Sequence, residues 1–329
     1  MLAISWALAA LRPKGPFPIL VVTGEHGTAK STTAAIMKAL IDPNTATKRS
    51  LSREERDLFI SALNMHVQAF DNISSLSPWM SDALCRLATG GAFVTRELYT
   101  DLDETLIDAV RPIVLNGIED FVTRPDLADR SVFIELEKIA EDQRKAESQL
   151  WSEFEKVRPG IIGALLTAVS RGLRELPTTK LDKPPRMADF AIWVTACEPA
   201  IWAKGTFAKA YRNNANKAVD GILDGDPVAV AIKTLMSMET EWESTASLLL
   251  VKLEQLAGDR AVRDKDWPKG PRALSNHLKR ITPPLRTIGI EVKRLREGGT
   301  GDRMIRITLA AEREGKSSSQ SSQSSQDGE

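Results

Sequence analysis

Short apolar runs alternate with longer segments of mixed polarity over the first 137 residues. Runs of strand length, rich in β-branched residues, lie at residues 19–23, 67–70, 112–116 and 131–136. Between them the pattern predicts helices before Pro13, over residues 31–41, and after the capping box Ser52-Arg53-Glu54-Glu55. Strands that alternate with helices predict an α/β fold, with a parallel sheet covered on both faces.

After residue 137 the pattern becomes helical, and helices are expected at 139–158, 159–175, 186–197, 205–222, 226–240 and 246–257. The composition changes again at Gly258. Residues 271–289 predict two short helices split by Pro283 and Pro284, and residues 290–309 predict a strand, a glycine-rich turn and a second strand. That order is typical of a winged helix, a fold that places a helix in the major groove of DNA.

Charge is balanced over the whole chain, with 44 Lys and Arg against 44 Asp and Glu in 329 residues. This balance excludes a uniformly basic nucleic-acid coat. Residues 259–309, however, hold thirteen basic and six acidic residues, a net charge of +7. Two distant cysteines and three scattered histidines argue against a disulfide framework or a zinc site. No targeting signal or run of membrane-spanning length is evident, so we expect a cytoplasmic protein with no membrane partner.

The strongest chemical signal is the segment Gly24–Ser31, between the expected strand 19–23 and the expected helix 31–41. A glycine-containing loop at a helix N-terminus directs backbone N–H groups and the helix dipole toward a bound anion. Lys30 would neutralise the β- and γ-phosphates of ATP, and the Ser31 hydroxyl would ligate Mg²⁺. The expected nucleotide-binding residues are Gly24, Glu25, His26, Gly27, Thr28, Ala29, Lys30, Ser31 and Thr32. Ala29 departs from the usual glycine, and a chance turn before a helix is the alternative.

Polar residues follow two of the other expected strands, at the sheet edge where ligands of open α/β sheets bind. Asp71 could hold Mg²⁺ through water, and Asn116 could orient the attacking water or contact the γ-phosphate. Asn72 stands where many ATPases have a glutamate that activates this water. The alternative is that Asp71 caps a turn and Asn116 makes a local hydrogen bond.

These residues, with the segments 116–119 and 124–130, resemble the ATPase module of AAA+ and superfamily III helicase-like proteins. The blocks 69–91 and 95–104 are similar to primase-helicase-like ATP-binding proteins of phages, plasmids and integrated elements. The similarity extends over about residues 15–309 and implies a P-loop NTPase sheet.

Position by position, the resemblance implies a Walker A motif at Gly24–Ser31, Walker B at Asp71 and sensor 1 at Asn116. It also implies a homo-oligomeric ring in which an arginine, Arg130 or secondly Arg124, reaches the nucleotide of a neighbouring subunit. The alternative is that both arginines pair with Asp126 and Asp129 on the surface. With Asn72 in place of glutamate, hydrolysis is slow or the base comes from Glu97 or Glu119. The resemblance also implies that segment 90–104, whose only basic residue is Arg96, corresponds to a hairpin that contacts DNA in the pore; a solvated loop is the alternative.

The basic segment is the expected DNA-binding part, and the alternative is a merely solvated charged face. The candidate contacts are Lys269, Arg272, Lys279 and Arg280 on or beside the helices, and Lys293, Arg294, Arg296 and Arg303 on the wing.

The expected domains are a P-loop ATPase core (1–137), a helical lid or linker (138–257), a winged helix (258–310) and a disordered Ser/Gln tail (311–329). This organisation predicts a DNA-dependent ATPase with a helicase- or loader-like role in replication of a mobile element. A nucleotide-gated DNA-binding regulator with slow or no hydrolysis is the alternative. Because Met1 falls inside an expected helix, an additional upstream primase-like part is also an alternative.

Overall fold

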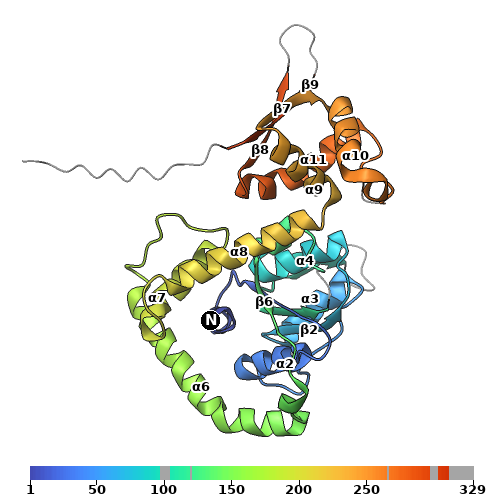
Figure 1. Cartoon of the computed structure of the whole chain (residues 1–329). Helices are drawn as coiled ribbons and strands as arrows, with labels where there is room; N and C mark the ends of the chain where they lie inside the picture. The colour runs from blue at the N-terminus through green and yellow to red at the C-terminus, as the bar shows by residue number, and fades with distance from the viewer. Residues whose placement is uncertain (97–103, 119–120, 265–266, 297–302, 311–329) are drawn as a thin grey trace, which may run out of the picture. The chain divides into compact units, whose positions relative to one another are not determined.

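A computed structural model describes residues 1–96, 104–118, 121–264, 267–296 and 303–310, and the chain forms two compact units, residues 1–226 and 227–329 (Figure 1). The expected disordered tail, 311–329, lies outside the described residues, as do Glu97 and Glu119. In the described part of the chain, no helix is long and apolar enough to cross a membrane.

Four parallel strands form the central sheet of the first unit, as the sequence predicted. They are β1 (Ile19–Thr23), β2 (Gln68–Ile73), β5 (Ile113–Gly117) and β6 (Ser131–Glu135), in the order β2-β5-β1-β6. All three pairings are parallel. The carboxyl ends of β1, β5 and β2 therefore meet at one edge of the sheet, and there the polar residues cluster.

Helices cover both faces of this sheet because alternate strand residues point to opposite sides. Leu20, Val22, Val114 and Val132 pack against α1 (Leu2–Ala10), α2 (Lys30–Ile41) and the later helices of the unit. Their neighbours Ile19, Val21, Ile113 and Leu115 pack against α3 (Glu55–Asn64), α4 (Pro78–Thr89) and α5 (Pro125–Ala128). The predicted α/β class is confirmed.

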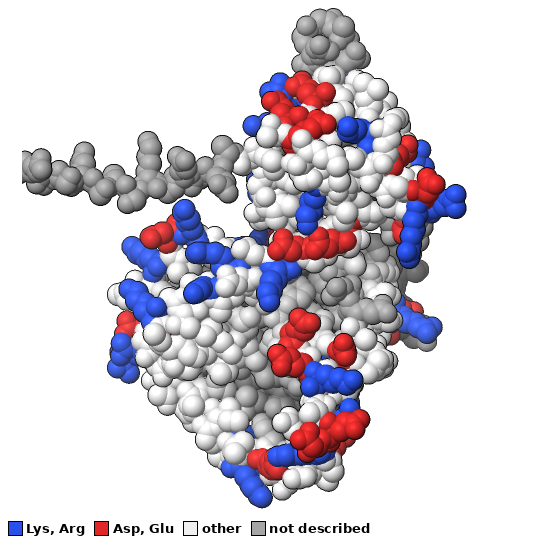
Figure 2. Space-filling model, viewed as in Figure 1, with Lys and Arg blue, Asp and Glu red and all other residues white. Residues whose placement is uncertain are grey.

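The helical region after the sheet consists of α6 (Glu147–Glu175), α7 (Ala188–Cys197) and α8 (Thr206–Asp224). The predicted break before Pro159 is wrong, because α6 is continuous through it. Proline removes the hydrogen bond to the carbonyl four residues earlier, which belongs to the exposed Glu155 and is accessible to water. In the view of Figure 2, basic side chains gather over α8 and the connector before α7.

A short antiparallel hairpin, β3 (Phe93–Arg96) with β4 (Glu104–Ile107), lies where the resemblance implied one. Residues 97–103, between the two strands in the sequence, and the Arg96 side chain lie outside the described residues. The Phe93 ring stacks on that of Phe59 in α3, with 5.2 Å between centroids. This contact attaches the base of the hairpin to the core.

The second unit consists of α9 (Pro227–Met238), β7 (Glu241–Thr245), α10 (Ala246–Val262), α11 (Pro271–Thr287), β8 (Ile290–Arg296) and β9 (Arg303–Leu309). Its strands form an antiparallel sheet in the order β7-β9-β8. The sequence of helix, strand, two helices and two strands is that of a winged helix, so the predicted fold of this part is confirmed.

Two features of this unit differ from the expectation. The predicted split of residues 271–289 is wrong: α11 runs through Pro283 and Pro284, because the carbonyls that lose their donors belong to the exposed Lys279 and Arg280. The unit also begins at Pro227 rather than at 258, because β7 pairs with β9 and joins α9 and α10 to the wing. The composition change at Gly258 marks a kink inside α10, where φ is 76°.

Candidate functional site

The loop between β1 and α2 has the backbone shape of a phosphate-binding loop. Gly24 has φ 145° and Gly27 has φ 80°, and both values favour glycine. A Cβ on Gly24 would lie 2.6 Å from the carbonyl oxygen of Leu136, so no larger residue fits there. The loop ends where α2, a helix of twelve residues, begins at Lys30. The N-terminus of such a helix favours a bound anion.

Ala29 takes the left-handed conformation of the glycine that it replaces. Its φ and ψ are 59° and 31°, and it is the N-cap residue of α2. A Cβ in this region costs about 1–2 kcal/mol. Alanine in place of glycine therefore adds a side chain and strain, while the backbone at position 29 keeps the left-handed conformation.

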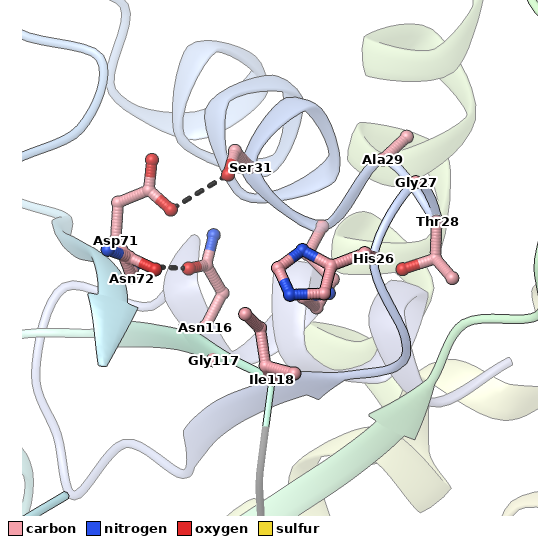
Figure 3. Close-up of a pocket in the computed structure, with 11 residues that line it drawn as sticks. His26, Gly27, Thr28, Ala29, Ser31, Asp71, Asn72, Asn116, Gly117 and Ile118 are labelled. Carbon is pink, nitrogen blue, oxygen red and sulfur yellow. Dashed lines mark hydrogen bonds between the residues drawn. The ribbon is translucent and has the colours of Figure 1, made fainter. Parts of the chain in front are cut away.

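A cavity of about 220 Å³ lies beside the loop, and most of the predicted nucleotide residues line it (Figure 3). The lining consists of His26, Gly27, Thr28, Ala29, Lys30, Ser31, Asp71, Asn72, Asn116, Gly117 and Ile118. Residues from the ends of β1, β2 and β5 thus meet in one place, as their positions in the sequence predicted.

The ammonium group of Lys30 is bonded to the backbone of the loop. Its Nζ donates to the carbonyl oxygens of Gly24 at 2.7 Å and of Glu25 at 2.6 Å. The Thr28 hydroxyl also donates to Glu25 oxygen, at 3.0 Å, and Thr28 is buried. These bonds hold a positive charge at the N-terminus of α2, where phosphate oxygens would be neutralised.

Ser31 and Asp71 form the candidate metal position. The Ser31 hydroxyl donates to Asp71 Oδ1 at 2.8 Å, and Lys48 Nζ lies 3.4 Å from Asp71 Oδ2. Burial raises the pKa of Asp71, but the Ser31 hydroxyl, the adjacent Asn116 amide and the charge of Lys48 together hold it below its ordinary value. The carboxylate is therefore ionised at neutral pH.

Asn116 connects the ends of β5 and β2. It is 1% exposed, and its Oδ1 accepts the backbone N–H of Asn72 at 2.8 Å. Asn72 has a left-handed φ of 58°, which asparagine tolerates better than most residues. The Nδ2 atom of Asn116 is buried and faces the Asp71 carboxylate closely enough to lower its pKa, but it makes no well-formed hydrogen bond to a described residue; Figure 3 shows the amide between Asp71, Asn72 and Ser31.

This donor set fits ATP with Mg²⁺. A hydroxyl and a carboxylate oxygen suit a hard cation, which usually takes its remaining ligands from water and phosphate. The unpartnered Nδ2 of Asn116 is a buried donor that an oxygen atom in the cavity would satisfy. Lys30 and the helix N-terminus supply the positive charge that a triphosphate requires.

Both arginine-finger candidates are paired within the chain. Arg130 donates to the Asp126 carboxylate at 2.6 Å and to its carbonyl at 2.7 Å, and Arg124 donates to Asp82 at 2.8 Å. The expected pairing with Asp126 is thus seen for Arg130, whereas Arg124 pairs instead with Asp82. Neither arginine lines the cavity.

Sequence reasoning missed two cations beside the site. Residue 49 forms an isolated parallel bridge to Phe70, which places Lys48 next to the end of β2. A Cβ on Gly27 would lie 3.9 Å from Arg144 Nη2, which brings a residue from beyond β6 to the phosphate loop. Neither residue belongs to a recognisable motif, because only tertiary contacts give them their positions.

A second cavity, of about 760 Å³, lies in the C-terminal unit and collects four of the predicted DNA contacts. They are Arg272 and Lys279 from α11, Arg294 from β8 and Arg303 from β9. Lys269 bonds instead to the carbonyls of Val262 and Asp264, each at 3.2 Å, and Arg280 contacts His277 Nδ1 at 3.0 Å.

Two further wing residues complete the predicted DNA-binding set. Lys293 lies 3.6 Å from Glu291, with which it forms an ion pair. The Arg296 side chain lies outside the described residues.

Comparison with known proteins gives a family and several solved structures. The A-form apo structure of the NrS-1 C-terminal region is 16% identical, with a TM-score of 0.44, over 94% of this chain and 71% of that chain. The JCV helicase is 13% identical, with a TM-score of 0.31, over 66% of this chain and 65% of that chain. No curated protein matches. Residues 228–324 match the C-terminal domain of AICE RepA, and because residues 1–221 match the actinomycete integrative conjugative element replication proteins, the chain belongs to that family.

Proposed function

We propose that the protein is a DNA-dependent ATPase with a helicase- or loader-like role in replication of the mobile element. The observation that carries this proposal is the cavity in which Lys30, Ser31, Asp71 and Asn116 meet at the N-terminus of α2. The family supports a role in replication, and the basic cavity of the C-terminal unit supports DNA as the partner.

Four residues of the cavity have assigned tasks in this proposal. Lys30 and the backbone N–H groups of the loop bind the β- and γ-phosphates. Ser31 and Asp71 would hold Mg²⁺, which would neutralise the charge that develops on the phosphates. Asn116, fixed through its Oδ1 to Asn72, directs Nδ2 toward the γ-phosphate or the attacking water.

A ring assembly is the second part of the proposal. To reach a neighbouring nucleotide, Arg130 would exchange its bonds to Asp126 for a phosphate, and Arg124 would leave Asp82. Both pairs are partly exposed, so breaking them costs little. Light scattering of the full chain with and without Mg-ATP would report the assembly directly.

Substitution of Lys30 tests the catalytic proposal. Lys30→Ala removes the charge that binds the phosphates, so we expect DNA-stimulated phosphate release to fall at least about 100-fold, as for loss of one strong transition-state contact. Lys156→Ala is the matched control, because Lys156 is exposed on α6 and remote in sequence from the loop. Unchanged release by Lys30→Ala would contradict the proposal.

A nucleotide-gated DNA-binding regulator is the second candidate. The observation in its favour is that the described lining of the cavity contains one carboxylate, Asp71, while Asn72 occupies the place of a catalytic glutamate. A regulator of this kind would bind ATP without turning it over. Fast hydrolysis in a single-turnover assay with DNA would exclude it, and ATP-dependent DNA binding without hydrolysis would favour it.

A further inference from the structure

The basic cavity of the C-terminal unit, here called the α11 groove, combines a charged rim with a neutral polar centre. Arg272 and Lys279 line it from α11, and Arg294 and Arg303 line it from the wing strands. Ser275 and Asn276 lie between the two α11 cations along the helix. None of the described lining residues is acidic, so the groove suits a polyanion.

The lining residues of α11 share one face of the helix. Residues 272, 275, 276 and 279 follow the i, i+3, i+4, i+7 spacing and span about 10 Å along the axis. The opposite face buries Leu274, Leu278, Ile281 and Leu285. Burial of this face fixes the rotation of α11, so the polar face is presented outward.

Contacts between α11 and the wing keep the groove in shape. The Arg294 guanidinium donates to the Ser275 carbonyl, and Arg286 Nε donates to Glu291 Oε1 at 3.0 Å. These bonds tie β8 to both ends of the helix. The polar face is therefore preorganised before any ligand binds.

The exposed Asn276 is the residue of the α11 groove that bears on sequence recognition. Binding to a phosphate backbone requires only positive charge and single donors. An asparagine amide instead offers one donor and one acceptor side by side, which matches N7 and N6 of adenine in the major groove. The cations on either side of Asn276 would contact the two phosphate backbones that border the major groove of the DNA.

We propose that Asn276 reads an adenine in the major groove of duplex DNA, so that the C-terminal unit binds a selected sequence rather than any duplex. Arg272, Lys279, Arg294 and Arg303 supply the backbone contacts. This inference rests on the DNA binding of the proposed function, and it adds the form of the DNA and the base that is read.

The test is selection of binding sites by the full-length chain from a pool of random duplexes, followed by affinities of single-base variants. We expect a site with one required adenine. Asn276→Ala should reduce discrimination at that position by about 5- to 150-fold. It should leave the salt dependence of binding unchanged, because no phosphate contact is lost.

Two variants make the result specific to the amide. Lys279→Ala should weaken binding to all sequences and reduce the salt slope by about 1. Gln255→Ala removes an exposed amide from α10, outside the groove, and should change neither property. Thermal unfolding of each variant verifies that the fold is kept.

The outcomes separate this inference from the proposed function. Duplex binding without any sequence preference, or an equal effect of Asn276→Ala on all sequences, would overturn the adenine contact and leave DNA binding intact. Preference for single strands over duplexes would overturn the inference in the same way. Absence of binding to every DNA would contradict the proposed function as well.

Discussion

At the scale of single residues, Ala29 in the loop after β1 keeps the backbone conformation of a glycine although it carries a side chain. Ala29 has φ 59°, the conformation that glycine adopts without cost. The strain is tolerated because the neighbouring bonds of Lys30 and Thr28 to loop carbonyls determine the same backbone path. The site is therefore built on a residue whose conformation is imposed by its surroundings.

Ala29→Gly should relieve this strain. We expect the free energy of unfolding to rise by about 0.5–1 kcal/mol, the difference between the relieved left-handed strain and the added entropy of the unfolded chain. Urea unfolding measures it. Ala215→Gly, at an exposed position inside α8, is the control of opposite sign, with an expected loss of about 1 kcal/mol. A loss of stability in both variants would show that Ala29 is not strained.

Asp71 should give stability a pH-dependent part. Its pKa is lower in the folded state than in the unfolded chain, so its contribution is present above the ordinary carboxylate pKa and is lost as pH falls through the folded value. We expect Asp71→Asn to reduce the difference in urea midpoint between neutral and acid pH, measured without nucleotide. An identical pH dependence in wild type and variant would contradict the lowered pKa of Asp71, which the Ser31 hydroxyl, the Asn116 amide and Lys48 together produce.

At the scale of elements, α8 packs its buried Phe207 and Tyr211 into the core of the sheet, and one further side chain, Asn214, bonds it to the edge strand β6. The Asn214 amide donates to the Phe133 carbonyl at 2.7 Å, and its Oδ1 accepts the Phe133 N–H at 2.9 Å. The amide thereby completes the outer edge of β6, which has no strand partner on that side among the described residues. This contact adds two hydrogen bonds to the apolar packing that joins the helical region to the sheet.

Asn214→Ala should loosen this junction. Removing both bonds leaves backbone groups of β6 without partners, and we expect a loss of about 1–3 kcal/mol in the free energy of unfolding. Asn213→Ala, at the neighbouring exposed position, should stay within about 0.5 kcal/mol. Hydrogen exchange of the Phe133 amide gives a local measurement, and unchanged protection in Asn214→Ala would contradict the role of the amide.

Most elements of the fold were predictable from the sequence, because buried parallel strands appear as uninterrupted apolar runs. The strand β7 was missed because its five residues, EWEST, include two glutamates and bury little. The breaks expected at Pro159 and Pro283 were wrong because the affected carbonyls are exposed. Positions that depend on tertiary contacts, such as those of Lys48 and Arg144, leave no local pattern to find.

At the scale of the whole molecule, each of the two units contains one of the two cavities described above. The cavity with Lys30 and Asp71 belongs to residues 1–226, and the α11 groove belongs to residues 227–329. The matched family segments, 1–221 and 228–324, divide the chain at nearly the same place. In the proposed function, DNA bound by the second unit changes the rate of hydrolysis in the first.

The affinity of the second unit for DNA should depend on salt concentration. If the four groove cations each contact one phosphate, the logarithm of the DNA affinity should fall with the logarithm of salt concentration with a slope of about −3 to −4. Fluorescence anisotropy of a labelled duplex over a salt series measures this slope. A slope near zero would contradict the role of the groove in DNA binding.

The most direct test of the central claim is the rate of phosphate release by the full-length chain with and without DNA, at low and at high salt. We predict that DNA raises the rate at low salt and that high salt removes the increase as the DNA dissociates. We also predict that Lys30→Ala lowers release at least about 100-fold under all conditions. Equal rates with and without bound DNA would contradict the proposed DNA-dependent ATPase.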